Sequence, residues 1–559
     1  MATATSSAPS GRSPSDAAHP LRRAPRAASV SATRERLRHQ LGVVHPEPAW
    51  WAWVVAGVVG AVAGLLRFVG LGRPETLVFD ETYYVKQAYS YLIAGHELAV
   101  TPSPDPVPAG ETDTYANDLF VAGTLDVFER TPDFVVHPPL GKWMIAAGMQ
   151  IDPDSTFFWR FSAAVVGTLS VVLLVLVARR LLGSTLLGGV AGVLLAVDGH
   201  HIVHSRTSLL DIFLSFWILV AFAFLLADRF QARERLAERV ARGLGAGTLS
   251  PYGPWLGWRP FRLLAGISLG AACATKWSGL YVLAAMGLLS VAWDIGARRS
   301  AGVPRWFRGA LLRDSWLAFL AMVPVAALTY LASWAGWFRA TDSYDRTWAL
   351  DNPDEAVSWL PSSLASLWHY HQSAYGFHTT INVTDNSHPY MANPWSWLVM
   401  GRPTSFHYQG QSEGLTGCGV EACSEAVTSL GNPVVWWGGT IALVVVALAW
   451  LLRRDWRCGA ILVPLAASYL PWFAFQQRTI FTFYAVAFAP FVVLALTYAL
   501  GLVLGPVDAG PQRRLWGTVG AGAVVMAAVA CLLFFYPVWT AELITTAEWR
   551  LRMWWPSWV

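Results

Sequence analysis

The sequence predicts an all-α integral membrane protein with about eleven transmembrane helices and two large exterior loops. Of the 559 residues, 54% are hydrophobic and only 14% are charged, whereas soluble domains carry roughly 25% charged residues. The mean hydropathy is +0.40. This composition excludes a disordered chain, a small disulfide scaffold and most soluble enzymes. The net charge of +4 gives little support to a nucleic-acid partner.

The N-terminal region differs in composition from the rest of the chain. Residues 1–45 are rich in Ala, Ser, Pro and Arg and contain no long apolar run, which predicts a disordered cytoplasmic tail. Residues 46–559 are expected to form one transmembrane domain. The first apolar run would also serve as the signal anchor, because no cleavable signal peptide is recognisable before it.

Eleven apolar runs are close to the length that crosses a bilayer as a helix. They are 50–70, 156–178, 182–199, 208–227, 261–275, 277–294, 316–336, 434–452, 458–475, 480–503 and 515–537. Arginine clusters precede the first run and follow every second run, so on this count they all lie on one side of the membrane. The positive-inside rule then predicts a cytoplasmic N-terminus and an exterior C-terminus.

Two long polar and aromatic segments fall outside on this topology, residues 71–155 and 337–433. Loops of this length are usually functional or form small domains. The second segment contains Cys418 and Cys423, spaced as C-x4-C. In an oxidising exterior this spacing favours a local disulfide, whereas a zinc site would need two further ligands.

Asp80 and Glu81 are adjacent acids shortly after the first apolar run. A helix that begins near Asp80 would be stabilised by acids in its first turn. A carboxylate at the exterior membrane face is also well placed to act as a general base, because desolvation raises its pKa. The sequence alone leaves both interpretations open.

Several basic residues fall close to the predicted exterior boundary. Each is a candidate for binding a phosphate, and each has the alternative role of an interfacial anchor. His137 begins a stiff His-Pro-Pro turn ahead of Lys142, and three histidines at 200, 201 and 204 have ligand-like spacing, although a polar rim under the outer loops is favoured over a metal site. The candidates for substrate binding are His137, Lys142, Arg160, Arg206, Lys276 and Arg478.

Six motifs occur in a fixed order along the chain: FDETYYVKQA, HPPLGKW, FWRFSA, HSRTSLLDIF, TKWSGLY and HPYMANPWSW. Together they resemble the protein O-mannosyltransferases, specifically the polyprenol-phosphate-mannose–protein mannosyltransferases of actinobacteria. The resemblance covers roughly residues 50–559.

The resemblance implies a GT-C fold in a bacterial plasma membrane, with the site facing outward. It also implies transfer of mannose from polyprenyl phosphate mannose to Ser/Thr hydroxyls of exported proteins, by an inverting single displacement. The acceptors would be Ser/Thr-rich segments of secreted proteins, met as they leave the translocon. No cofactor is required by the sequence, and dependence on a divalent metal stays open.

The resemblance also implies roles for individual residues. Asp80 would be the catalytic base, and Glu81 would help to position the acceptor or the donor. Arg160 would lie at the substrate site, with His137 and Lys142 beside it.

Three alternatives remain at this point. One is another lipid-linked GT-C transferase that acts on a glycan or lipid acceptor. Another is a transporter or flippase, which would favour inverted repeats and charges at the bilayer midplane. The last is a noncatalytic scaffold for export machinery, against which the intact pair of acids argues.

Overall fold

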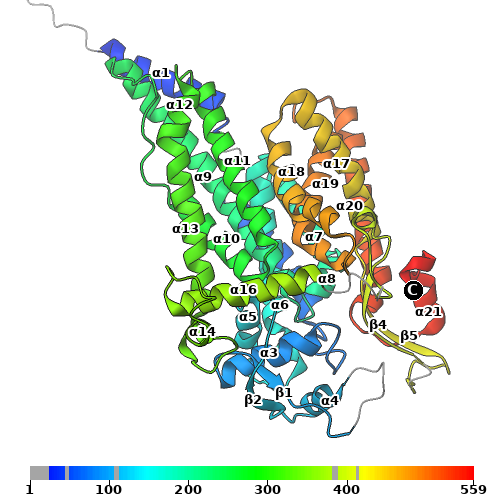
Figure 1. The fold of residues 1–559 in the computed structure, drawn as a ribbon. Helices are drawn as coiled ribbons and strands as arrows, with labels where there is room; N and C mark the ends of the chain where they lie inside the picture. Colours follow the sequence, from blue (N-terminus) through cyan, green and yellow to red (C-terminus); the bar gives the residue numbers. More distant parts are fainter. Residues whose placement is uncertain (1–23, 44–48, 106–112, 381–387, 411–413) are drawn as a thin grey trace, which may run out of the picture.

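Long apolar helices make up most of the computed structural model, which describes residues 24–43, 49–105, 113–380, 388–410 and 414–559 (Figure 1). Nine helical segments of these residues can cross a membrane by length and composition. They are α2 (Ala49–Phe68), α6 (Thr156–Leu182), α9 (Leu210–Ala246), α11 (Gly279–Ser300), α12 (Trp306–Ala310) with η1 (Leu311–Ser315) and α13 (Trp316–Ser333), α17 (Pro433–Arg453), α18 (Trp456–Tyr469) with η4 (Leu470–Phe475), η5 (Thr482–Phe488) with α19 (Ala489–Leu504), and α20 (Pro511–Trp539).

The two remaining predicted spans form shorter apolar helices, α7 (Thr185–Ala196) and α10 (Pro260–Thr275). All eleven apolar runs are therefore helical, which confirms the predicted fold class. In the most apolar stretch of each span, 72% of the residues are buried for α9 and 78% for η5 with α19, against 17% for the span that ends in α13 and 22% for α20. Helices that are apolar all round belong either in a core or against lipid, so α9 and α19 form the centre and α13 and α20 face the lipid.

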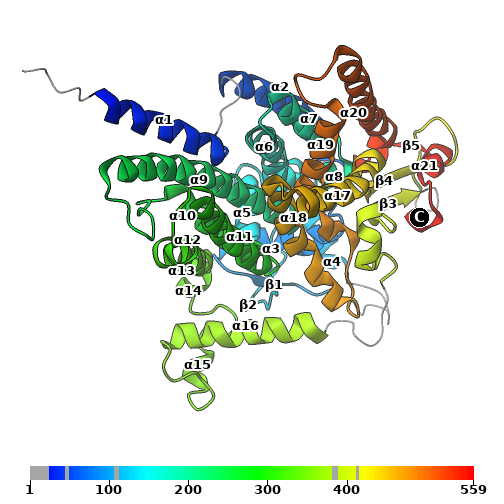
Figure 2. The ribbon, with the colours of Figure 1, turned by 90° about the horizontal axis from the view of Figure 1, so that it is seen from above.

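The two long polar segments gather at one end of the bundle (Figure 1). We call this end, which carries α3, α5 and α16, the loop end; α16 lies across it as a peripheral helix (Figure 2). Two small antiparallel sheets, β1–β2 and β3–β4–β5, supplement the helices here. The elements are α3 (Glu81–Ile93), β1 (Leu98–Val100), α4 (Tyr115–Val121), β2 (Phe128–Pro132), α5 (Leu140–Met149), α8 (Gly199–His204), α14 (Ala335–Arg339), α15 (Trp348–Asp351), α16 (Ser362–Thr380), η2 (Pro394–Val399), β3 (Thr404–Gly410), β4 (Cys423–Ser429), β5 (Ile544–Thr545), α21 (Thr546–Arg552) and η6 (Pro556–Trp558).

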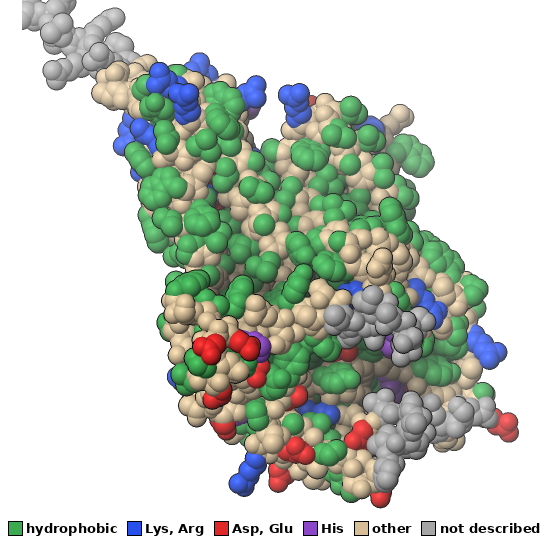
Figure 3. Space-filling view, in the orientation of Figure 1, with side chains coloured by type: hydrophobic (Ala, Val, Ile, Leu, Met, Phe, Trp, Pro, Cys, Tyr) green, Lys and Arg blue, Asp and Glu red, His purple; other side chains and the backbone are tan. Residues whose placement is uncertain are grey.

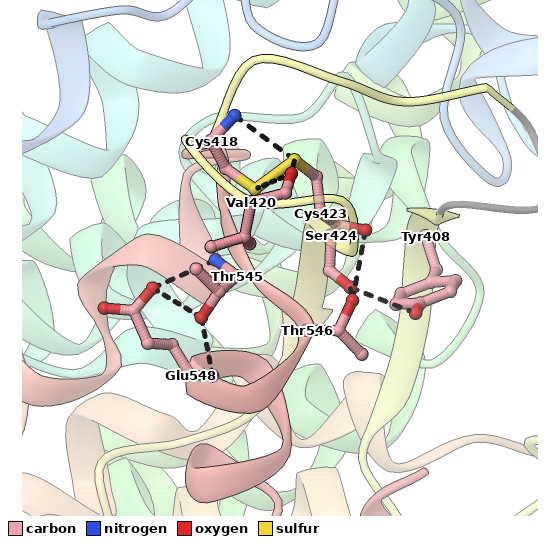
Figure 4. The surroundings of a disulfide bond; sticks show 8 residues. All are labelled: Tyr408, Cys418, Val420, Cys423, Ser424, Thr545, Thr546 and Glu548. Atoms are coloured by element: carbon pink, nitrogen blue, oxygen red, sulfur yellow. Dashed lines mark hydrogen bonds between the residues drawn. A yellow bond between two sulfur atoms is a disulfide. The ribbon is translucent and has the colours of Figure 1, made fainter.

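A disulfide bond joins Cys418 to Cys423, the first residue of β4 (Figure 4). The backbone N–H of Cys418 also donates to the Cys423 sulfur. In the segment that pairs with β4 and continues into α21, Thr545 and Glu548 form a capping box at the start of that helix. The disulfide and the cap together fix the end of the three-stranded sheet.

The expectation of a disordered tail over residues 1–45 is wrong for its second half. Residues 24–40 form the helix α1 (Ala24–Gln40), while residues 1–23 lie outside the described residues. Leu37 and Leu41 of this segment are buried against apolar side chains of α9, and Arg34 and Arg38 both pair with Glu234. Composition alone did not reveal α1, because its stabilising partners are on α9, about two hundred residues away.

Charges are distributed unequally between the two ends of the molecule (Figure 3). Acidic side chains appear at the loop end, and an apolar surface covers the middle. We call the opposite end the basic end; it comprises α1, residues 228–259, residues 294–316 and the turns after α17 and α19. The basic side chains that this end contributes include Arg239, Arg242, Arg298, Arg313, Arg453, Arg454 and Arg514.

Candidate active site

The Asp80–Glu81 pair lies at the loop end, where the chain leaves α2 and enters α3. Asp80 is the N-cap residue of α3, but its side chain makes no capping hydrogen bond. The preceding residue, Phe79, has a φ of +48°, a left-handed conformation that is unfavourable for a bulky side chain. Its ring stacks on Phe406 of β3 at 4.9 Å and contacts Phe483 at 5.4 Å. Aromatic packing therefore holds the backbone in the strained turn that presents Asp80.

Glu81 is fully enclosed and fully hydrogen-bonded. Its two oxygens accept from Arg160 Nε at 2.9 Å and Nη2 at 2.8 Å, in a bidentate ion pair with both side chains 0% exposed. They also accept from the backbone N–H groups of Ser208 at 2.7 Å and Val78 at 3.0 Å. A carboxylate with four donors has no lone pair left for a substrate, so Glu81 anchors the turn.

Arg160 is equally saturated. Besides Glu81, its guanidinium donates to the backbone carbonyls of Pro74 at 2.9 Å and Thr76 at 2.8 Å. These carbonyls belong to the segment that leads from α2 to Asp80. Arg160 therefore fixes the approach to Asp80 from inside the protein, and the expectation that it binds substrate directly does not fit this geometry.

Asp80 has far fewer partners than its neighbour. Among the described residues, its carboxylate receives one hydrogen bond, a long one of 3.4 Å from the Tyr84 hydroxyl. Burial raises the pKa of Asp80 to about 6, an effect that the Lys276 charge opposes and the Asp211 charge reinforces. A carboxyl group with this pKa is ionised at neutral pH and retains a real affinity for a proton.

A cavity of about 350 Å³ opens beside these groups, between α9, α11, α16 and α18. Asp211 and Lys276, whose charges act on Asp80, line it and are paired at 2.7 Å. Arg478 lines it as well and donates to the His378 carbonyl at 3.0 Å. The Nε of Arg478 is buried without a hydrogen-bond partner among the described residues. The cavity thus brings the cations Lys276 and Arg478 together, and Asp80, which does not line it, is within electrostatic reach of Lys276.

Two histidines complete the polar lining of the cavity, His137 and His378. Their rings lie 5.3 Å apart. Burial lowers the pKa of His137 well below its usual value and lowers that of His378 to about 4, and the nearby Lys276 and Arg478 charges add to both shifts. Both imidazoles are therefore neutral near pH 7 and can donate or accept a hydrogen bond. The rest of the lining is largely apolar, including Leu214, Ile218, Leu280, Val282 and Trp472.

Comparison with known proteins places this geometry in a family. The family model described as dolichyl-phosphate-mannose-protein mannosyltransferase matches residues 117–299, and that of the C-terminal four-helix region of protein-O-mannosyltransferase matches residues 363–558. A polyprenol-phosphate-mannose–protein mannosyltransferase of Mycolicibacterium smegmatis is 37% identical over 90% of this chain and 93% of its own.

The chain belongs to the polyprenol-phosphate-mannose–protein mannosyltransferases.

Other members of this family match this chain over a similar share of its length. The one from Mycobacterium tuberculosis is 36% identical over 90% of this chain and 92% of its own, and the one from Corynebacterium glutamicum is 32% identical over 92% and 96%. The structure of the S. cerevisiae protein O-mannosyltransferase Pmt1–Pmt2 complex bound to the sugar donor superposes with a TM-score of 0.66 at 14% identity, covering 95% of this chain and 94% of that chain. That likeness shows a shared GT-C fold.

Within this mannosyltransferase fold, the side chains of two further predicted substrate-binding residues are buried and bond to groups inside the protein. Lys142 is 0% exposed and donates to Glu97 at 2.5 Å and to the His137 carbonyl at 3.0 Å. Arg206 donates to the carbonyls of Arg67, Val69 and Gly70 at 2.7–2.9 Å, which satisfies the last turn of α2. Neither lines the cavity. Lys142 instead orients the turn that carries His137, and Arg206 holds the chain that leads to Asp80.

The three histidines of α8 are buried and contact different partners. His200, His201 and His204 are each 0% exposed, and His200 contacts Ser429 of β4 while His201 contacts Arg67. No group of three or more His, Cys, Asp or Glu that could hold a metal ion occurs among the described residues. These histidines therefore pack α8 against β4 and α2.

Some cavity residues were not singled out from the sequence. His378 and Tyr375 both lie on α16 and line the cavity, and Tyr484 of η5 does so from the other side. The helix holds His371, Tyr375 and His378 at spacings of four and three residues, which is one helical face. That spacing was the available signal, but an aromatic face on a surface helix more often packs against lipid or core.

Proposed function

We propose that this protein transfers mannose from polyprenyl phosphate mannose to Ser/Thr hydroxyls of exported proteins, with Asp80 as the general base. The observation that carries the proposal is the hydrogen bonding and the pKa of Asp80. It is a weakly hydrogen-bonded carboxylate with a pKa raised to about 6, next to a cavity that Lys276 and Arg478 line. A lipid-linked sugar phosphate and a hydroxyl acceptor need this combination of base and cations.

The reaction is a single displacement at the anomeric carbon. The acceptor oxygen forms a bond to C1 of mannose while the bond from C1 to the phosphate oxygen breaks, and its electron pair stays on the phosphate. The hydroxyl proton passes to the Asp80 carboxylate, because a Ser or Thr hydroxyl is a poor nucleophile at neutral pH. A β-linked donor gives an α-mannoside, and no covalent enzyme intermediate forms.

Cations of the cavity stabilise the leaving group. Asp211 engages one of the three N–H donors of Lys276, which leaves this ammonium able to contact a phosphate oxygen. Arg478 offers its buried, unpartnered Nε. Positive charge that is fixed before the reaction lowers the barrier more than mobile solvent can, and the neutral His137 and His378 add hydrogen bonds without adding repulsion.

The apolar side of the cavity suits the first isoprene units of the donor. Leu214 and Ile218 of α9, Leu280 of α11 and Trp472 of η4 form this wall, and these elements continue into membrane-spanning helices. A carrier lipid would therefore keep its chain in the bilayer while its phosphate reaches Lys276 and Arg478.

The proposed topology places the N-terminus and the basic end in the cytoplasm of a bacterial plasma membrane, and the loop end with Asp80 outside. The arginine clusters that flank the spans at the basic end support this orientation. An exterior site suits Ser/Thr-rich segments that emerge unfolded during export, since an extended segment enters a membrane-level cleft more easily than a folded domain does.

A reconstituted transfer assay tests the proposal. Purified enzyme in nanodiscs receives labelled polyprenyl phosphate mannose together with either a Ser/Thr-rich peptide or a mannan oligosaccharide, and mass spectrometry identifies the product. The proposal predicts an α-mannosyl peptide and no elongated glycan. Elongated glycan without mannosyl peptide would instead identify a glycan-directed transferase.

A further inference from the structure

A second cavity lies at the basic end, far from the groups that the transfer reaction uses. It is a shallow, open cavity of about 570 Å³, bordered by the last turns of α9, the segment 248–255 and η1. Three arginines line it, Arg239, Arg242 and Arg313. The proposed transfer mechanism assigns no role to this cavity.

The wall of this cavity is held in place by a buried ion pair. Arg298 donates to both oxygens of Asp314 at 2.6 and 3.0 Å, and to the carbonyls of Tyr252 and Pro254 at 3.0 Å each. Gly253, between those two carbonyls, has a φ of +78°, and an added Cβ there would lie 2.7 Å from the Arg298 guanidinium. The segment is therefore fixed before any ligand arrives, which reduces the entropy lost on binding.

The π-helical turn η1 supplies one arginine of the cavity. It directs Asp314 into the protein, where it meets Arg298, while the neighbouring Arg313 lines the cavity. Single π-helical turns inside α-helices often mark functional positions. Here the turn points the Asp314 carboxylate into the wall and leaves the Arg313 guanidinium in the cavity.

The positive charge of the cavity is mostly uncompensated. Arg242 pairs with Glu238 at 3.1 Å. Arg313 donates to the Ser250 hydroxyl at 3.2 Å, and Arg239 donates to the Trp255 carbonyl. Within the described part of the chain, Arg239 and Arg313 have no carboxylate within ion-pair distance, so their contacts are with neutral oxygen atoms. An anion would meet two unneutralised guanidinium groups here.

Exposed apolar side chains border the same cavity. Trp255 lines it, is 46% exposed, and lies under the Arg313 guanidinium, 5.4 Å from it. Trp316 contacts Trp255 at 6.4 Å and is 47% exposed. Leu312, which directly precedes Arg313 in η1, is 59% exposed. Indole rings beside arginines are typical of the boundary between headgroups and acyl chains.

We propose that this cavity binds the headgroup of an anionic phospholipid. Arg239, Arg242 and Arg313 would contact the phosphate and any further headgroup charge, since planar guanidinium groups match phosphate oxygens in pairs. The acyl chains would run along Trp255, Leu312 and Trp316 into the bilayer. Charge complementarity and adjacent apolar exposure select a lipid over a soluble phosphate ester, which would leave those side chains uncovered.

Native mass spectrometry of the full-length enzyme in detergent tests this site. The titrants are dioleoyl phosphatidylglycerol and the zwitterionic dioleoyl phosphatidylcholine. The test variant is R239Q/R242Q/R313Q. The matched control is R453Q/R454Q/R514Q, which removes the same charge from exposed positions at the same end of the molecule. Thermal unfolding without added lipid verifies that both variants are folded.

We expect the wild type and the control to bind phosphatidylglycerol alike and to prefer it over phosphatidylcholine. The test variant should bind it on the order of a hundredfold more weakly, since each basic side chain near an anionic headgroup contributes a separate attraction. Equal binding by the test variant and the control would overturn the site. Displacement of the lipid by millimolar glycerol phosphate would overturn the choice of a lipid as its ligand.

Discussion

The two ends of the molecule hold their buried carboxylates in opposite ways. At the basic end, Asp228 and Asp294 share two arginines, Arg259 and Arg262, and each carboxylate has a donor from both at 2.8–3.2 Å. At the loop end, Asp80 has one hydrogen bond of 3.4 Å. A buried arginine N–H without a partner among the described residues occurs at both ends, in Arg262 and in Arg478, so the difference lies in the carboxylates. A carboxylate that several arginine donors engage holds helices together, whereas a buried carboxylate with few partners is able to accept a proton from a substrate.

The same contrast occurs within one pair of neighbouring residues. Glu81 and Asp80 have adjacent positions and the same charge, but Glu81 accepts four hydrogen bonds from Arg160 and two backbone groups. Asp80 accepts only one, long hydrogen bond from Tyr84. Substitutions of saturated carboxylates such as Glu81 should lower stability, whereas substitutions at the cavity should lower the transfer rate of a folded protein.

The largest effect on stability is expected from Glu81→Gln. It leaves the Arg160 charge buried without a counter-ion, which typically costs about 3–5 kcal/mol of the free energy of unfolding. Thermal unfolding in detergent should show the loss, together with little soluble, monodisperse protein. Glu75→Gln, at an exposed position of the same segment, is the control and should behave as the wild type. A stable Glu81→Gln protein would contradict the anchoring role.

A smaller loss of stability is expected from Asp294→Asn at the basic end. Asp228 still compensates part of the charge of Arg259 and Arg262, so the cost should be about 1–3 kcal/mol. The mannosyl transfer rate per folded molecule should stay unchanged, because this network is remote from the cavity. The matched control is Asp508→Asn, an exposed acid in the turn after α19. A loss of transfer without a loss of stability would contradict the purely structural role of this network.

Arg478→Gln should weaken donor use without unfolding the protein. We expect kcat/KM for polyprenyl phosphate mannose to fall roughly ten- to a hundredfold, mainly through KM, which corresponds to one charge-assisted hydrogen bond. Arg478→Lys should recover part of the loss, because it retains the charge but not the fork of donors. A KM for the donor equal to that of the wild type would show that Arg478 does not bind it.

The pH dependence of transfer should reflect Asp80. Its pKa is raised from 3.8 to about 6, and only the ionised form accepts the acceptor's proton. The value of kcat/KM should therefore be constant above about pH 7 and fall about tenfold per pH unit below pH 6. Because ionisation of Asp80 is unfavourable in the folded protein, its contribution to stability is largest below pH 3.8 and is lost as the pH rises through 6. A profile without an acidic limb would contradict the base assignment.

The sequence predicted the fold class because hydrophobic length is a direct consequence of the bilayer, and it placed Asp80 and the two cavity cations Lys276 and Arg478 near one boundary. It did not distinguish these cations from Arg160, Lys142 and Arg206. Those three satisfy carbonyl groups and carboxylates supplied by segments that are distant in the chain, and only the folded arrangement reveals such partners. The same reason explains why α1 was missed, since Glu234 and the apolar face of α9 stabilise it.

The central claim is that Asp80 accepts the proton of the acceptor hydroxyl, while the cavity residues Lys276 and Arg478 bind the donor phosphate. The most direct test compares the wild type with Asp80→Asn in nanodiscs, and measures in parallel the retention of labelled polyprenyl phosphate mannose and the formation of mannosyl peptide. The account predicts a folded variant that binds donor with the wild-type affinity and transfers at least about a thousandfold more slowly. Transfer within tenfold of the wild type would contradict it.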